Sequence, residues 1–164
     1  MNQADITVHD RPVVDAALTE SERTDGPAAA LELPDGSIVT GDLLGASAAL
    51  LLNALKELAG IGHEIKIISP QAIEPIQSLK TKYLGSRNPR LHTDEVLIAL
   101  SVSAATSKDA KLAMEQLPKL KGCQAHVSVM PGSVDIKQFK LLSIQATFEA
   151  KYEKNSVFFN NKGV

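Results

Sequence analysis

The strongest constraint on the fold is the segment 46–59, where Ala and Leu fill almost every position of a helical pattern. Both residues favour helix, and Gly60 stands where a left-handed residue commonly ends one. The apolar stretch Leu43 to Leu55 is shorter than the ~20 apolar residues of a membrane span, and Ser47 and Asn53 interrupt it. A helix this apolar needs cover on more than one side. We therefore expect it to lie between two layers of a protein core.

Length and composition set the size and contents of that core. The chain has 164 residues and 44% hydrophobic content, which is enough for one core of ordinary size. Aromatic residues make up 4% and Trp is absent, so Leu, Ile, Val and Ala must fill the interior. This composition favours helices packed on a sheet.

Local patterns predict the elements around the apolar helix. Ala29–Leu33 and Ile38–Thr40 flank Pro34-Asp35-Gly36-Ser37, a turn sequence that predicts a β-hairpin. Short β-branched or alternating runs predict further strands at 64–68, 125–129 and 144–148. Helical spacing or capping predicts helices from Pro12, from Pro70, from Thr93, over 108–117 and over 134–142. The order predicts an α/β fold, a three-layer αβα sandwich with a mixed sheet of about five strands.

The same patterns suggest a division of the chain into three parts. Residues 1–26 have too little apolar surface to fold alone, so we treat them as an N-terminal appendage with one short helix. Residues 27–150 form a single α/β domain in this prediction. Residues 151–164 show no clear period and are assigned to a C-terminal tail.

Charge and cysteine usage restrict the partners and the compartment. The net charge of −2 argues against a nucleic-acid-binding role. Cys123 is the only cysteine, so no disulfide within the chain and no Cys-rich zinc site is expected, and a reducing cytoplasm is the simplest location. The first residues lack the basic and apolar regions of a secretory signal. We expect no membrane partner, no cofactor and no metal.

Several strings of residues resemble the bacterial family known as domain of unknown function 1846. They are Gly26 to Gly36, Ile38 to Gly41, Leu43 to Ser47, Leu50 to Lys56, Ile68 to Pro70, Ile73 to Gln77, Leu84 to Leu100 and Glu115 to Cys123. Members of the family are much longer, so the resemblance implies a C-terminal domain alone. Its partners would be the N-terminal domains of a full-length relative or a second copy. One departure is that only Asp42 separates Gly41 from Leu43, where the family has a longer loop.

The resemblance also implies a topology like that of the cytidine deaminases. Zinc deaminases need a His-x-Glu and a Pro-Cys-x-x-Cys to hold the metal and move protons. The corresponding places here read Gly45-Ala46-Ser47 and Ser69-Pro70-Gln71-Ala72. We therefore predict a deaminase-like fold without the zinc site, and a chain that is not a zinc deaminase.

The richest polar segment runs from Arg87 to Glu95, behind Lys80 and Lys82 and with no acid between Glu74 and Asp94. Cations beside a helix start are suited to a phosphate or carboxylate, because backbone N–H groups and the helix dipole favour anions there. The candidate ligand-binding residues are Arg87, Asn88, Arg90 and Thr93, and the candidate catalytic residues are His92, Asp94 and Glu95. In the alternative interpretation Thr93, Asp94 and Glu95 cap the helix and the arginines pair with nearby carboxylates.

Two other candidates are weaker. His126 and Ser128 share a strand face, but no acid that would complete a catalytic set is visible in the sequence.

Our first hypothesis is therefore a non-catalytic C-terminal module that packs against other domains or a second copy and helps to shape a shared site. The alternative is that Arg87 to Glu95 belongs to an active site for a small anionic metabolite.

Overall fold

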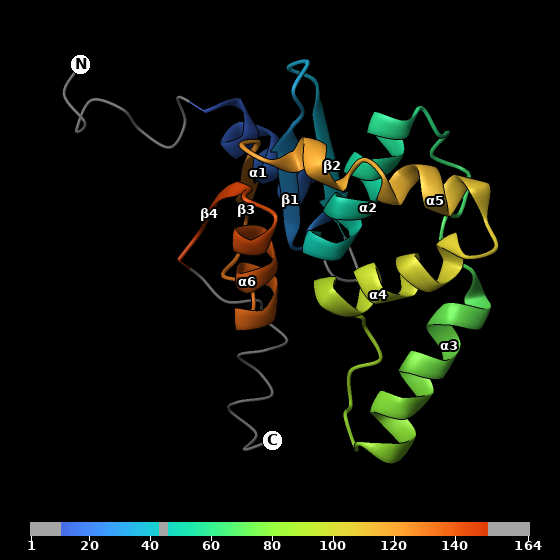
Figure 1. The fold of residues 1–164 in the computed structure, drawn as a ribbon. Coiled ribbons are helices and arrows are strands. Elements are labelled where there is room, and N and C mark those ends of the chain that lie inside the picture. Colours follow the sequence, from blue (N-terminus) through green and yellow to red (C-terminus); the bar gives the residue numbers. More distant parts are fainter. Residues whose placement is uncertain (1–10, 43–45, 151–164) are drawn as a thin grey trace.

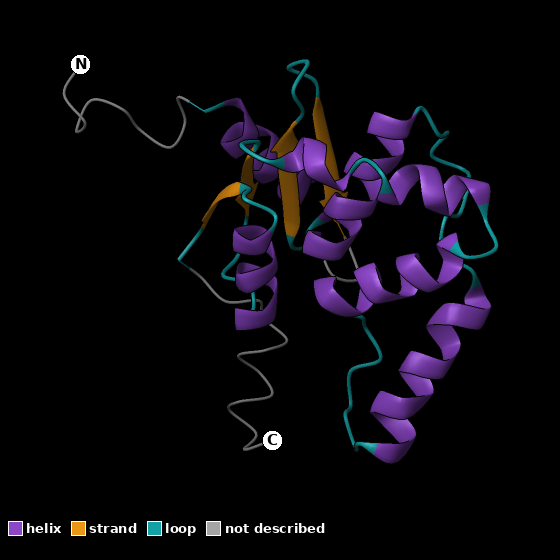
Figure 2. Cartoon of the chain, viewed as in Figure 1, coloured by secondary structure: helices purple, strands orange, loops and turns teal. Residues whose placement is uncertain are grey.

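The computed structural model describes residues 11–42 and 46–150, so the whole predicted tail and residues 1–10 of the appendage lie outside the described part. Helices and strands are interspersed along these ranges (Figures 1 and 2). They are α1 (Pro12–Thr24), β1 (Ala28–Glu32), β2 (Ile38–Asp42), α2 (Ala46–Ala59), α3 (Pro70–Ser78), the π-helical turn η3 (Leu79–Tyr83), α4 (Thr93–Ala104), α5 (Lys108–Met114), the 3-10 turn η4 (Leu117–Leu120), β3 (Gln124–Val127), α6 (Ser133–Leu141) and β4 (Gln145–Phe148).

One mixed sheet of four strands organises the described residues, in the order β2-β1-β3-β4. The predicted hairpin is confirmed, since β1 and β2 pair antiparallel with Leu31 opposite Val39. β3 returns antiparallel to β1, and β4 lies parallel to β3 with His126 opposite Thr147. The connection from β3 to β4 runs through α6, as parallel neighbours require a crossover.

The two faces of the sheet carry separate apolar clusters. Ala29 and Leu31 of β1 belong to the large cluster that contains α2, α4 and α5. Ala30, between them, packs instead against Val13 and Ala17 of α1. Because successive strand residues point to opposite faces, α1 covers one face and the other helices lie on the second. The predicted helix from Pro12 is confirmed, and it docks on the sheet.

The apolar helix of the sequence is α2, and it lies where its pattern predicts. Leu50, Leu51, Ala54 and Leu55 are inaccessible to solvent, between the sheet and the helices α4 and α5. Gly60 ends the helix at a φ of 72°, the left-handed conformation expected from its position. α2 also runs close to β2, and a Cβ added to Gly41 would lie 2.3 Å from the backbone nitrogen of Leu50.

One strand of the prediction is wrong. Residues 64–68 form turns and bends in the structure, so the sheet has four described strands where we expected about five. Residues 64–66 are exposed, whereas Ile67 and Ile68 turn into the core. This segment does not alternate between two faces as a half-buried strand does, and β propensity depends on such context. The two isoleucines fill the core without pairing.

None of the helices in the described ranges is long and apolar enough to cross a membrane.

Candidate functional site

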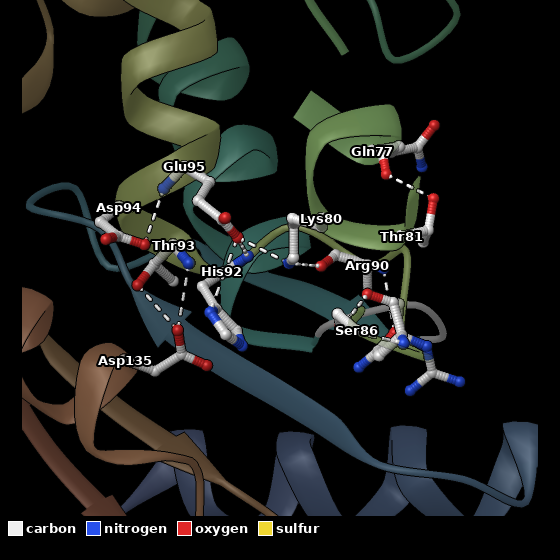
Figure 3. A network of polar contacts seen from close by, with 11 residues as sticks. Gln77, Lys80, Thr81, Ser86, Arg90, His92, Thr93, Asp94, Glu95 and Asp135 are labelled. Carbon is white, nitrogen blue, oxygen red and sulfur yellow. Dashed lines mark hydrogen bonds and ion pairs between the residues drawn. The ribbon is translucent and has the colours of Figure 1, made fainter. Parts of the chain in front are cut away.

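The polar segment singled out in the sequence lies at the start of α4, beside the end of η3 (Figure 3). Gly85 leaves η3 at a φ of 72°, which lets the chain turn back toward α4. His92 is the N-cap residue, and Thr93 is the first residue of the helix. The cap therefore stands one residue earlier than the sequence suggested.

Glu95 links the helix start to η3. Its Oε1 accepts a hydrogen bond from the backbone nitrogen of His92 at 2.7 Å, one half of a capping box. The same oxygen lies 2.9 Å from Nζ of Lys80, which also donates to the carbonyl of Arg90. Burial alone would raise the pKa of Glu95, but the hydrogen bonds from His92 and Lys80 outweigh it and lower this pKa. The ion pair is largely shielded, with the Lys80 side chain 11% exposed.

Thr93 is fixed from a distant part of the chain. Its backbone nitrogen and Oγ1 both donate to Oδ1 of Asp135, at 3.1 and 2.8 Å. Asp135 lies in the first turn of α6, 42 residues later in the sequence. Sequence reasoning missed it, and its acidic position in a helix's first turn was the only available signal. The hydroxyl proposed as a ligand contact is therefore used to join α4 to α6.

The candidate catalytic residues lie close together but are engaged as caps. One ligand atom each from His92, Asp94 and Glu95 lies within 4.8 Å of the others, a group that geometry would allow to hold a metal ion. Ideal helix geometry would point Asp94 and Glu95 apart. Both instead fold back to the helix start, since Oδ1 of Asp94 accepts from the Glu95 nitrogen at 2.8 Å.

His92 is only loosely oriented. Its Nδ1 is 3.6 Å from Oε1 of Glu95, which is beyond hydrogen-bonding distance. Its side chain is 53% exposed. An imidazole held this way lacks the fixed tautomer and direction that a general base needs.

The loop before the helix uses its polar side chains locally. Oδ1 of Asn88 accepts from the backbone nitrogen of Arg90 at 2.9 Å, and Oγ of Ser86 accepts from Asn88 at 3.2 Å. Arg87 is exposed and Arg90 is half-buried. The structure thus brings Lys80, Arg90, His92, Thr93 and Glu95 into one network and leaves the Arg87 side chain facing solvent.

A second polar cluster lies on the α1 face of the sheet, and His126 is its only member that the sequence singled out. His126 of β3 is 1% exposed, and its Nε2 is 2.6 Å from Oε2 of Glu149. Its Nδ1 is 2.7 Å from Oγ1 of Thr147, which accepts from Nη1 of Arg11 at 2.7 Å. Burial lowers the pKa of His126, and Glu149 partly opposes that change. Ser128 is not part of the cluster, because its Oγ accepts from the Ala28 nitrogen at 2.9 Å.

Burial favours the neutral form of this imidazole, in which one ring nitrogen donates and the other accepts. Thr147 has one proton, and the ring nitrogen at 2.7 Å is a closer acceptor than the Ala125 carbonyl at 3.4 Å. Nδ1 then accepts from Thr147, and Nε2 donates to Glu149. The cluster ties the start of α1 to β3 and β4. The missing acid of the His126 hypothesis is thus Glu149, which parallel pairing of β4 with β3 places beside it.

Comparison with known proteins identifies the family of this chain. Residues 9–158 match the profile of the family described as "Domain of unknown function DUF1846, C-terminal". The chain belongs to this family. It is 55% identical over 161 residues to the UPF0371 protein of Corynebacterium glutamicum and 47% identical over 161 residues to that of Streptococcus thermophilus. Each alignment covers 96% of this chain, but only 32% and 33% of those relatives. The chain therefore spans about a third of the length of the curated relatives that it matches.

Proposed function

We propose that the chain is a non-catalytic packing module of a larger protein, held against the part that precedes the corresponding domain in the family's full-length members. The observation that supports this most directly is the distribution of exposed apolar side chains. Five of the nine large ones in the described ranges lie between residues 79 and 102. They are Leu79, Tyr83, Leu84, Ile98 and Val102.

The outer side of α4 is the clearest part of this surface. Ile98 and Val102 are 58% and 59% exposed and stand four residues apart, so they lie on one face of the helix. The opposite face contributes Val96, Ala99 and Leu100 to the core. A helix that is apolar on both sides belongs between two layers, and the described residues provide only one. An exposed apolar face of this kind marks an interaction site.

The test compares the isolated chain with the full-length relative from Corynebacterium glutamicum. Ile98→Asp changes an exposed side chain in the isolated chain, so its stability should change by less than about 0.5 kcal/mol. In the relative, the matching substitution would bury a charge in a domain contact and should cost ~1–3 kcal/mol. Urea unfolding of both proteins measures the difference. The control is Leu141→Asp, at a side chain that is 66% exposed on α6.

A tolerated Ile98→Asp in both proteins contradicts the packing role of α4. An equal loss of stability from Ile98→Asp and Leu141→Asp in the relative would show that a charge is costly at any exposed apolar position. This result also contradicts the packing role of α4.

A second candidate function is that residues Arg87 to Glu95 form part of a site for a small phosphate- or carboxylate-bearing metabolite. The exposed guanidinium of Arg87 supports it. The helix start offers few free donors to such an anion, because three of its N–H groups already donate to carboxylates. The pairs are His92 to Glu95, Thr93 to Asp135 and Glu95 to Asp94. An anion would then depend on the side-chain cations alone. A thermal-shift screen of metabolites on the relative, with and without Arg90→Ala at the matching position, tests this candidate. Identical shifts in both proteins exclude it.

We also propose a deaminase-like topology and a cytoplasmic setting for the chain. A hairpin followed by a helix buried against the sheet is compatible with the cytidine-deaminase-like topology that the family resemblance implies. A cytoplasmic location, without nucleic-acid or membrane partners, is what the composition favours.

A further inference from the structure

The most protruding part of the described structure is the arm, defined here as residues 70–91. It comprises α3, η3 and the loop that leads to α4, and it extends away from the sheet (Figure 1). None of the described side chains of α3 is classed as buried, and Ile73 and Ile76 only partly pack against the core. The arm ends in η3 and Leu84, where Tyr83 is 79% and Leu84 is 69% exposed. We call residues 79–87 the arm tip.

The arm tip is held in place although it is exposed. Nζ of Lys80 reaches back to Glu95 and to the Arg90 carbonyl at the start of α4. The Leu84 nitrogen donates to the Leu79 carbonyl at 3.0 Å, and the Ser86 nitrogen donates to the Lys80 carbonyl at 2.8 Å. A surface that is already ordered loses less conformational entropy when it binds. Single π-helical turns of this kind occur frequently at functional sites.

The charge of the arm tip indicates which kind of partner surface it can bind. Between Glu74 and Asp94 the sequence has four cations and no acid, in a chain whose net charge is −2. Lys80 is occupied by Glu95, whereas Lys82 and Arg87 are exposed beside Tyr83 and Leu84. The tip therefore combines apolar side chains with positive charge. Its complement is an apolar pocket with acidic side chains at the rim.

We propose that the arm tip docks into such an acidic, apolar pocket on the region that precedes this domain in full-length relatives. This inference rests on the packing role proposed above and names its contact point. Tyr83 and Leu84 would fill the pocket, and Lys82 and Arg87 would pair with the acidic rim.

The small size of the tip favours a tethered partner over a second copy. A stable interface between separate chains buries about 1,200–2,000 Å² in total. The tip offers three large apolar side chains, Leu79, Tyr83 and Leu84. A partner in the same chain is present at an effective concentration of about millimolar, so a small contact suffices. A small anion, by contrast, would make no use of Tyr83 and Leu84.

Hydrogen exchange followed by mass spectrometry tests the docking. The isolated chain and the full-length relative from Corynebacterium glutamicum are compared under the same conditions. We expect amides of the arm tip to exchange at least about tenfold more slowly in the relative. The difference should shrink at about 1 M salt, where the screening length is about 3 Å. Lys82→Glu and Arg87→Glu at the matching positions should also remove it, whereas Lys137→Glu, at an exposed position of α6, should not.

The outcomes separate this inference from the packing role. If α4 is protected in the relative but the arm tip is not, the packing role stands and the docking of the tip is wrong. If neither segment is protected, both are wrong. Protection of the tip in the isolated chain that rises with its concentration identifies a second copy as the partner and overturns the proposal. Protection that is insensitive to salt and to charge reversal excludes the acidic rim.

Discussion

The close approach of β2 and α2 makes Gly41→Ala the most informative test of the fold. A Cβ at this position would lie 2.3 Å from the Leu50 nitrogen and 2.7 Å from the Ala46 carbonyl oxygen. Ordinary carbon contacts are ~3.5–4.0 Å long, so α2 would have to retreat by on the order of 1 Å. The atoms met are backbone, so no side-chain rotation relieves the contact. Gly41 does not have a positive φ, so Ala strains the packing and not the backbone conformation.

The cost follows from what α2 buries. Leu50, Leu51 and Leu55 are inaccessible to solvent, and a retreat of the helix would loosen all three. Overpacking of this kind costs ~1–3 kcal/mol. Ala also reduces the conformational entropy of the unfolded chain. That effect stabilises the folded state by about 0.4–1 kcal/mol, but only where Ala fits without strain. We therefore expect a net loss of about 2 kcal/mol. With a urea m-value of about 2 kcal/mol/M, the unfolding midpoint should fall by about 1 M.

Far-UV circular dichroism during urea unfolding measures this midpoint. Gly26→Ala is the matched control, because the nearest atom to its added Cβ is the Thr24 carbonyl oxygen at 4.0 Å. That variant should stay within about 0.5–1 kcal/mol of the parent. If Gly41→Ala lowers the midpoint no more than Gly26→Ala does, α2 does not lie against β2 as the structure has it.

Two further predictions concern the polar clusters. The pKa of His126 is lowered in the folded state below its ordinary 6.5, so the unfolded chain binds the proton more readily. Stability should therefore fall as the pH drops from about 6.5 toward the folded pKa, and His126→Gln should flatten this part of the urea midpoint profile. An unchanged slope in His126→Gln would show that this histidine does not cause the loss. Lys80→Met should destabilise the chain by ~1–3 kcal/mol, because it leaves the half-buried Glu95 carboxylate without its cation. Adding Glu95→Gln should recover part of that loss in urea unfolding, and an additive double variant would show that the pair is not coupled.

The sequence predicts the elements whose signals are local. Pro34-Asp35-Gly36-Ser37 defines its hairpin within four residues, and Gly60 ends α2 by its own backbone preference. The run 64–68 shows the limit of such reasoning. Its residue types favour a strand, but pairing requires a free neighbouring edge and an alternating environment, which no local pattern reveals.

In the two polar clusters, too, only the contacts between residues close in sequence could be predicted. Glu95 lies three residues from His92, so its capping role follows from spacing. Asp135 meets Thr93 across 42 residues, and Glu149 meets His126 across 23. These contacts depend on the packing of α6 on α4 and on β4 lying parallel to β3. One sequence gives no register for either.

The contacts at the start of α4 are those of a capped helix. An anion site at a helix start requires N–H groups that are free to donate, and in this structure carboxylates from Asp135, Glu95 and Asp94 accept from three of them. Each carboxylate ties the helix to another element or to its own first turn. The buried Lys80 then holds the arm against this capped end. The ion pair with Glu95 and the bond to the Arg90 carbonyl thus fix the direction of the arm relative to α4.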